Sequence, residues 1–187
     1  MSLRFAVLLS AAVATLPLAA AEVNGDAFHL TLPAQFGAAV KSTTTKDNIA
    51  TDTWVSKAPS GEAVVVSVSQ MPAKITDPAK LIDSTRDSLL QSVKGTLEKE
   101  EPITGALPAR KVVFRSGTAF LRARLTVDGD RLYDVLYVGR SEDQRNAPAV
   151  GLIFDSFQIT PAPAAADTVT TTTTPAATTT AATTTSH

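Results

Sequence analysis

Short stretches in which apolar and polar residues alternate run through the middle of the chain, and most of them end at proline or glycine. Alternation with a period of two is typical of a strand that buries one face. The clearest stretch is Phe28–Leu32, which Pro33 ends, and the valine-rich stretch Ala63–Met71 stops at Pro72. We therefore expect a β-sheet to organise the fold.

The same signals predict further strands at Thr53–Ser56, Thr96–Glu101, Ala109–Arg115, Thr118–Val127, Arg131–Val138 and Ser156–Ile159. The residues between Pro33 and Thr53 are predicted to form a polar loop. Asp128-Gly129 is a hairpin signal. A two-residue loop there places opposite one another the pairs Leu125 and Leu132, Leu121 and Leu136, Arg124 and Tyr133, and Phe120 and Tyr137.

One helix is predicted with defined ends. Asp77 is a side-chain cap, and Pro78 suits the first helical position. Lys94-Gly95 is predicted to end the helix with a cation and a C-terminal glycine. A second, short helix is predicted at Ala147–Asp155. The first helix carries an apolar stripe at helical spacing, formed by Leu81, Ile82, Thr85, Leu89 and Val93.

Strands that pair mainly in hairpins, together with two helices, predict a single α+β domain in which helices flank an antiparallel sheet. The chain contains no cysteine, which excludes disulfides, thiolate nucleophiles and cysteine metal sites. The predicted domain, residues 22–160, is long enough to bury a core without such covalent links.

Several turn and core residues resemble the PsbP-like domain family. They are the opening Phe28-x-Leu30-x-Leu32-Pro33-x-x-Phe36, the early Trp54, the turn Gly105-x-Leu107-Pro108-Ala109, the strand residues Tyr133 and Tyr137, and the closing Phe154-Asp155-Ser156-Phe157. The family includes the extrinsic PsbP subunit of photosystem II, a Ran-binding nuclear import factor of the same fold, and many exported bacterial proteins. The resemblance covers roughly residues 25–160. It implies an antiparallel sheet flanked by helices and carries no active-site motif.

The N-terminal segment has the order of a secretory signal peptide: a start with Arg4, an apolar run over Phe5–Ala21, and an exit of small residues. We expect residues 1–21 to be removed by cleavage after Ala21. A membrane-anchoring helix is the alternative, but the run is mostly alanine and Pro17 would break it. After cleavage no transmembrane anchor is expected, and the protein is placed in the periplasm or outside the cell of a bacterium.

The composition changes abruptly after Ile159. Residues 161–187 are almost entirely threonine, alanine and proline. Such a segment has too little apolar surface to offset its chain entropy, so a disordered tail is predicted. Either an O-glycosylated stalk or an unmodified tail fits this composition.

Charge and composition exclude several classes of function. The chain has 17 lysine and arginine residues against 18 acidic residues, with no basic run that would suit nucleic acid. Glycine patterns that cradle phosphate and clusters of metal ligands are both missing from the sequence, so no metal or other cofactor is expected. A Ser-His-Asp triad would depend on His29, the one histidine of the domain. Its place in an alternating strand predicts a solvent-facing side chain.

Two groups of residues are candidate sites. Arg122, Arg124, Tyr133 and Tyr137 lie on one face of the predicted sheet, where guanidinium and aromatic groups suit a carboxylate or a protein surface. An ordinary solvated sheet face with cross-strand packing is the alternative. Asp134 lies on the opposite face, among leucines. Its carboxylate points toward the core, as at many functional sites, or else lies at the sheet rim or pairs with an arginine.

The acidic strand with Glu98, Glu100 and Glu101 is interpreted as a charged edge that resists aggregation. Catalysis there would require two of these carboxylates to come together. The main hypothesis is an exported, non-catalytic domain that binds a protein partner or an envelope component. The alternative is a carrier of a small anionic ligand, held by Arg122 and Arg124 in a pocket between the sheet and a helix.

Overall fold

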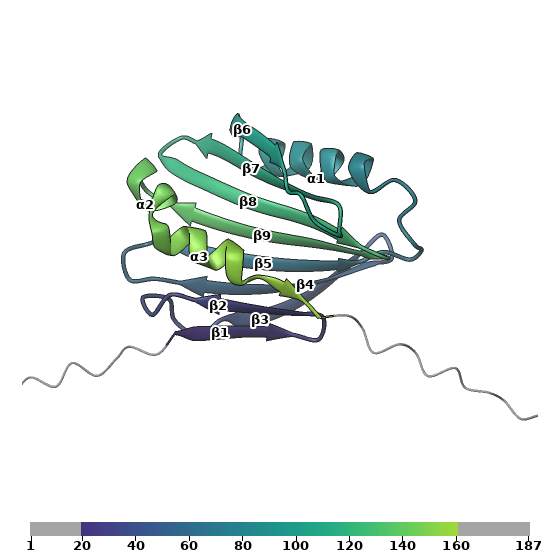
Figure 1. Cartoon of the computed structure of the whole chain (residues 1–187), viewed down its shortest axis with the longest axis horizontal. Helices are drawn as coiled ribbons and strands as arrows, with labels where there is room; N and C mark the ends of the chain where they lie inside the picture. Colours follow the sequence, from purple (N-terminus) through teal and green to yellow (C-terminus); the bar gives the residue numbers. More distant parts are fainter. Residues whose placement is uncertain (1–19, 161–187) are drawn as a thin grey trace, which may run out of the picture.

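The computed structural model describes residues 20–160. The predicted C-terminal tail and nearly all of the predicted signal peptide lie outside these residues, so both stay predictions. Figure 1 shows the order of the elements along the chain. The strands are β1 (Ala21–Gly25), β2 (Phe28–Leu32), β3 (Val40–Lys46), β4 (Ile49–Lys57), β5 (Ala63–Gln70), β6 (Thr96–Pro102), β7 (Ala109–Ser116), β8 (Ala119–Asp128), β9 (Arg131–Gly139) and β10 (Gln158–Ile159). The helices are α1 (Pro78–Ser92), α2 (Glu142–Asn146) and α3 (Pro148–Ser156).

The strands form two antiparallel sheets. The large sheet has seven strands in the order β3-β4-β5-β9-β8-β7-β6, and the small sheet has three in the order β1-β2-β10. All neighbouring strands are antiparallel. The predicted α+β class, with helices flanking an antiparallel sheet, is confirmed.

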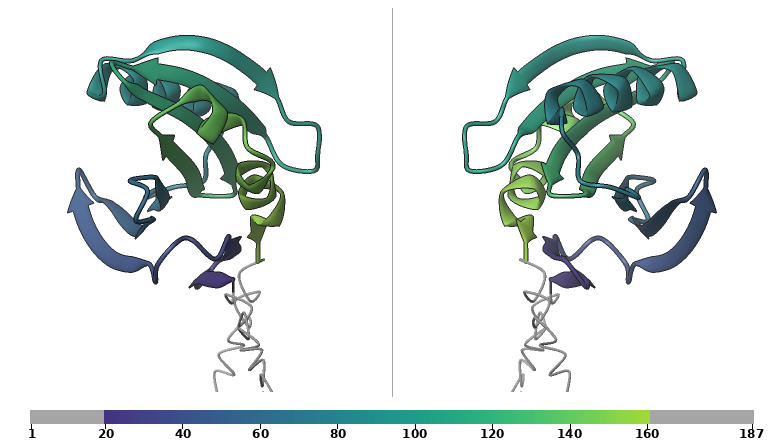
Figure 2. Two further views of the ribbon diagram at one scale, coloured as in Figure 1. Left: turned by 90° about the vertical axis from the view of Figure 1, so that its left-hand side faces the viewer. Right: turned by 90° about the vertical axis from the view of Figure 1, so that its right-hand side faces the viewer.

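Alternation along the strands divides the core between the two faces of the large sheet. On β9, the side chains of Tyr133 and Tyr137 belong to a cluster that includes the small sheet and α3. Leu132 and Leu136 belong to a second cluster, which α1 covers. Figure 2 shows α1 and α3 on opposite sides of the large sheet. The side chain of a β8 or β9 residue therefore faces α1 or α3 according to its place in the alternation.

Val40–Lys46 forms strand β3, so the prediction of a polar loop before Thr53 was wrong for this segment. All seven residues of β3 are exposed, which removes the apolar alternation that marks a half-buried strand. The hairpin turn to β4 is Asp47-Asn48, with φ angles of 53° and 61°. Two consecutive positive φ values are what a type I′ turn requires, and Asp and Asn tolerate them. Strand β1 and helix α2 were also not predicted.

The predicted register between β8 and β9 was wrong by two residues. The turn is Gly129-Asp130, and the last pair before it is Asp128 with Arg131. Only the first loop residue, Gly129, has a positive φ, of 62°, which is the pattern of a type II′ turn. The register pairs Leu125 with Asp134, Leu121 with Val138, Arg124 with Val135 and Phe120 with Gly139. Because the error is an even number of residues, every side chain stays on its predicted face.

Helix α1 begins as predicted. The Asp77 carboxylate accepts a hydrogen bond from the backbone N–H of Lys80 at 3.0 Å, and Pro78 is the first helical residue. Of the predicted apolar stripe, Ile82 is buried, and Leu81, Leu89 and Val93 pack at the edge of the α1 cluster. The fifth member, Thr85, donates its hydroxyl to the Leu81 carbonyl at 2.8 Å. This packing fixes α1 over β7 and β8.

The end of α1 differs from the prediction in one residue. Lys94, not Gly95, adopts the left-handed conformation, with φ of 50°. The backbone N–H of Lys94 donates to the Gln91 carbonyl at 3.2 Å, and that of Gly95 donates to the Leu90 carbonyl at 2.7 Å. These two bonds form a Schellman motif, in which the left-handed position is usually glycine.

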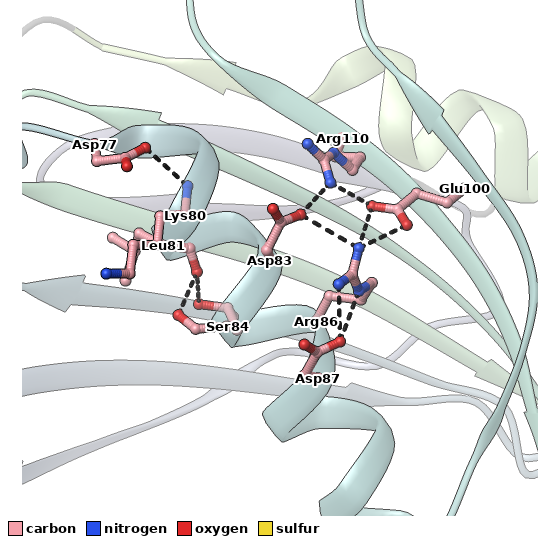
Figure 3. A network of polar contacts seen from close by, with 10 residues as sticks. Asp77, Lys80, Leu81, Asp83, Ser84, Arg86, Asp87, Glu100 and Arg110 are labelled. Atoms are coloured by element: carbon pink, nitrogen blue, oxygen red, sulfur yellow. Dashed lines mark hydrogen bonds and ion pairs between the residues drawn. The ribbon is translucent and has the colours of Figure 1, made fainter.

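Ion pairs connect α1 to the strands beneath it (Figure 3). Arg86 of α1 and Arg110 of β7 both donate to the carboxylate of Glu100 on β6, with N–O distances of 2.8 and 2.6 Å. Asp83 of α1 contacts both arginines. A hydrogen bond to Asp87, together with the one to Glu100, raises the pKa of Arg86, and the bond to Glu100 raises the pKa of Arg110. A shared network of this kind stabilises more than separate surface pairs do.

Candidate functional site

The four residues of the predicted binding face do lie on one face of the large sheet. Arg122 is directly opposite Tyr137 in the register of β8 and β9, and Arg124 and Tyr133 lie on the same side. This is the face that α3 covers, and both tyrosine side chains are buried. The Tyr137 hydroxyl donates to the Glu62 carboxylate at 2.5 Å, and burial together with this carboxylate raises the pKa of Tyr137. The two tyrosines therefore act as core residues.

The two arginines pack against α3 and the residue after it. The guanidinium of Arg122 lies 4.5 Å from the ring centre of Phe154, and that of Arg124 lies 5.3 Å from the ring centre of Phe157. Arg124 Nη1 also donates to the backbone carbonyl of Phe154 at 3.0 Å. Burial lowers the pKa of both arginines. These contacts hold α3 on the sheet, and none of them requires the anionic ligand of the alternative hypothesis.

Asp134 lies on the other face of β9, between Ser67 of β5 and Leu125 of β8. Its Oδ1 atom is buried and has no hydrogen-bond partner in residues 20–160. Removal of the carboxylate from water raises the pKa of Asp134 to about 7. No arginine pairs with it among the described residues. Asp134 is therefore an acid without a partner in these residues, on the face of the large sheet that α1 covers.

The three glutamates of β6 each have cationic partners instead of one another. Glu98 contacts Arg145, Glu100 contacts Arg86 and Arg110, and Glu101 contacts Lys99 and Lys111. The side chain of Arg145 is 5 % exposed, so Glu98 neutralises a buried charge. A carboxylate held by a guanidinium is a poor general acid, because the ion pair favours its charged form. These contacts give no support to a catalytic carboxylate pair.

His29 lies on the partly exposed side of β2, and its ring contacts Asn24 Oδ1 at 2.5 Å and Thr31 Oγ1 at 3.4 Å. The other ring nitrogen meets an amide and not a carboxylate, so within residues 20–160 the acid that a Ser-His-Asp triad requires is not at His29. In the part of the chain that the structure describes, no three side chains of His, Asp or Glu come together in a way that could hold a metal ion.

The surface that the sequence did not predict is strand β3, at one edge of the large sheet (Figure 2). An edge strand presents unpaired backbone N–H and C=O groups, which proteins usually protect. The opposite edge, β6, has such protection: a break in register between Leu97 and Lys99, several charges, and Pro102. Strand β3 pairs with β4 in regular register from Val40 to Lys46 and contains no proline. Its Ser-Thr-Thr-Thr centre was the available sequence signal, since threonine favours strands.

One ion-pair cluster holds β3 on its neighbour. Lys41 of β3 lies 2.8 Å from the Asp52 carboxylate of β4 and 4.8 Å from the ring centre of Trp54. Thr43 donates to the same carboxylate at 2.6 Å. These hydrogen bonds lower the pKa of Asp52, and the bond to Asp52 raises the pKa of Lys41. The cluster lies on the face of β3 that is turned toward the small sheet, and it leaves the outer edge of β3 unobstructed.

Comparison of the sequence with protein-family models and with characterised proteins gives no match. The structure, however, is similar to the solution structure of cyanobacterial PsbP (CyanoP) from Synechocystis sp. PCC 6803, with a TM-score of 0.58. The similarity covers 81% of this chain and 98% of that chain, at 12% sequence identity. The fold is PsbP-like. Identity at this level establishes the shared fold alone.

The PsbP-like fold confirms the resemblance seen in the turn and core residues. Phe28, Leu30, Leu32 and Phe36 are buried in the cluster that joins the small sheet to the large one, and Trp54 lies in the same cluster. These packing contacts depend on how the small sheet lies against the large one, and they do not indicate a ligand. Among residues 20–160, no helix has the length and apolar character that crossing a bilayer would require.

Proposed function

We propose that the protein is an exported, non-catalytic binding domain, and that it binds a partner protein by adding an extended segment of that partner to the outer edge of β3. The observation that carries the proposal is the contrast between the two edges of the large sheet. Both edge strands are seven residues long, but β6 has a break in register, four charged residues and a proline, whereas β3 pairs in regular register throughout, is exposed along its length, and carries charges only at Lys41 and Lys46. The signal-like N-terminus supports a role outside the cytoplasm.

Strand addition would supply affinity through the backbone. In an antiparallel pair, every second residue directs its N–H and C=O away from the neighbouring strand. An incoming segment can pair with these free groups of β3 whatever its side chains are, and the pockets or charges beside the edge then select its sequence.

The side chains of β3 indicate which segment would fit. Its centre, Ser42–Thr45, is uncharged, and β-branched residues pack well opposite threonine. Lys41 is paired with Asp52, whereas Lys46 has no ion-pair partner in the described part of the chain. We expect an extended segment rich in Thr, Val or Ile, with an acidic residue opposite Lys46.

The test is photo-crosslinking from the edge itself. A photo-reactive residue at Thr44 of β3, and as the matched control at Lys99 of β6, is irradiated in native envelope extract, with and without residues 161–187. We expect a specific adduct from Thr44 and none from Lys99, and the crosslinked peptide should be an extended segment. Adducts of equal yield from both edges would contradict the proposal.

Hydrogen exchange then tests the binding mode with the purified partner. Backbone amides of Val40–Lys46 that point outward should exchange rapidly in the free protein and become protected when the partner is bound. Protection elsewhere, with the exchange of β3 unchanged, would show that the partner docks on another surface.

A further inference from the structure

A small cleft separates the turn between β1 and β2 from the ends of β4, β5 and β9. Its volume is about 190 Å³, which corresponds to roughly six water molecules at ~30 Å³ each. It is lined by Asp26 and Phe28 of the small sheet and by Trp54, Val68, Gln70 and Arg131 of the large sheet. A volume of this size admits a molecule as small as a free amino acid.

The floor of the cleft is apolar. Phe28 and Trp54 pack edge to face, with their ring centres 4.9 Å apart, and Val68 lies beside them. Trp54 is 8 % exposed, and the Lys41 ammonium already lies over its ring at 4.8 Å. Little of the indole face is therefore free for a flat ring or a sugar to stack on, whereas a compact aliphatic group can contact the remaining surface.

The charges along the cleft are of both signs. Asp52 is neutralised by Lys41. Asp26 and Arg131 have no ion-pair partner within 4.0 Å among residues 20–160. Arg131 donates from Nε to the Gln70 side-chain carbonyl at 2.9 Å and its guanidinium also lies beside the Tyr133 hydroxyl. These two neighbours orient the guanidinium, and its remaining N–H groups can donate to another acceptor.

We propose that this cleft binds a small zwitterion with an aliphatic side chain, of the size and chemistry of a free amino acid such as leucine. Arg131 receives the carboxylate, Asp26 receives the ammonium, and the aliphatic group contacts Phe28, Trp54 and Val68. A simple anion would meet the unpaired charge of Asp26, and a simple amine would meet that of Arg131. Only a ligand with both charges satisfies both groups. This site is independent of the outer edge of β3.

Fluorescence of Trp54 measures occupancy directly, because it is the one tryptophan of the chain. The full domain is titrated with L-leucine and with two matched analogues. These are 3-methylbutylamine, which is leucine without the carboxylate, and 4-methylpentanoate, which is leucine without the ammonium. We expect a saturable change with L-leucine and at least tenfold weaker binding of each analogue. An analogue that binds as tightly as L-leucine overturns the proposal. So does the absence of a response to all three compounds at about 10 mM, which would mean that the free energy of binding is weaker than about 3 kcal/mol.

Variants test the assignment of the charges. Asp26→Asn and Arg131→Gln should each weaken L-leucine binding about tenfold. Asp47→Asn, in the exposed turn between β3 and β4, is the matched control and should leave binding unchanged. An effect of Asp26→Asn no larger than that of Asp47→Asn overturns the assignment. If Arg131→Gln disturbs the fold, an NMR titration of the unaltered protein tests the site instead, through the resonances of the Gln70 side-chain amide. They must shift on titration with L-leucine, and their failure to do so refutes the site.

Discussion

Replacement of Asp134 by asparagine should change how the stability of the protein depends on pH. Asp134 lies in β9 between Ser67 and Leu125, and its buried Oδ1 has no hydrogen-bond partner in residues 20–160. Burial without a partner disfavours the charged form, which is why the pKa of Asp134 is raised from 3.8 to about 7. Asparagine is nearly the same size and carries no charge at any pH.

The sign and the size of the effect follow from this pKa. Between pH 3.8 and about 7, the folded protein keeps a proton on Asp134 that the unfolded chain releases. The free energy of unfolding therefore falls as the pH rises through this window, and it is constant with respect to this group above pH 7. Each unit of difference between the unfolded and folded pKa of Asp134 is equivalent to about 1.4 kcal/mol, so the free energy of unfolding falls by at most about 4 kcal/mol over this window.

The measurement is urea unfolding of the original protein and of Asp134→Asn between pH 4 and pH 8. The stability of the variant relative to the original should rise by up to about 4 kcal/mol from the acid to the alkaline end. Asp52 and Glu101, whose pKa values are lowered, contribute in the opposite direction, but they are present in both proteins and cancel in the difference. A constant offset between the two proteins over the whole range would refute the reasoning, since it would mean that Asp134 titrates normally.

Substitutions at three further positions, two of them with a matched control, test the local structure through the free energy of unfolding. Lys94→Gly should stabilise the protein by about 0.5–1 kcal/mol, because glycine adopts φ of 50° without strain; Lys94→Ala should not, and a stabilising alanine would show that the side chain is responsible. Glu98→Gln should destabilise by about 1–3 kcal/mol, because it removes the negative charge that neutralises the buried Arg145 guanidinium. Glu142→Gln, which removes an exposed contact to the same arginine, should change stability by less than about 0.5 kcal/mol. Asp77→Ala should destabilise by about 1 kcal/mol through loss of the helix cap, and an unchanged midpoint would show that the cap is not needed once α1 is packed.

Much of the fold could be predicted because its signals are local. The limits of β2 and the start of α1 coincide with the predicted ones, since Pro33 ends a strand and Asp77-Pro78 begins a helix through the backbone chemistry of a few adjacent residues. β3 could not be found in this way, because an exposed edge strand has no buried face and so no alternation. The left-handed Lys94 was missed for a related reason: glycine is the usual residue at that position, and Gly95 stood next to it.

The candidate sites show where sequence reasoning ends. Alternation correctly placed Arg122, Arg124, Tyr133 and Tyr137 on one face of the sheet, even though the register was wrong by two residues. It could not show that α3, which follows β9 in the chain, covers this face. Likewise, three closely spaced glutamates on β6 look alike in sequence, yet each meets cations from different elements.

The sequence by itself determined the class of fold, the faces of the strands that it predicted, and the start of α1, because these depend on residues a few positions apart. Only the tertiary structure decided which face is covered, which acids are neutralised, which edge of the sheet is open, and which side chains line the cleft at Trp54. Each of these depends on elements distant in the chain. Asp26 and Arg131 line one cleft although more than a hundred residues separate them in sequence, and no pattern along the chain encodes that proximity.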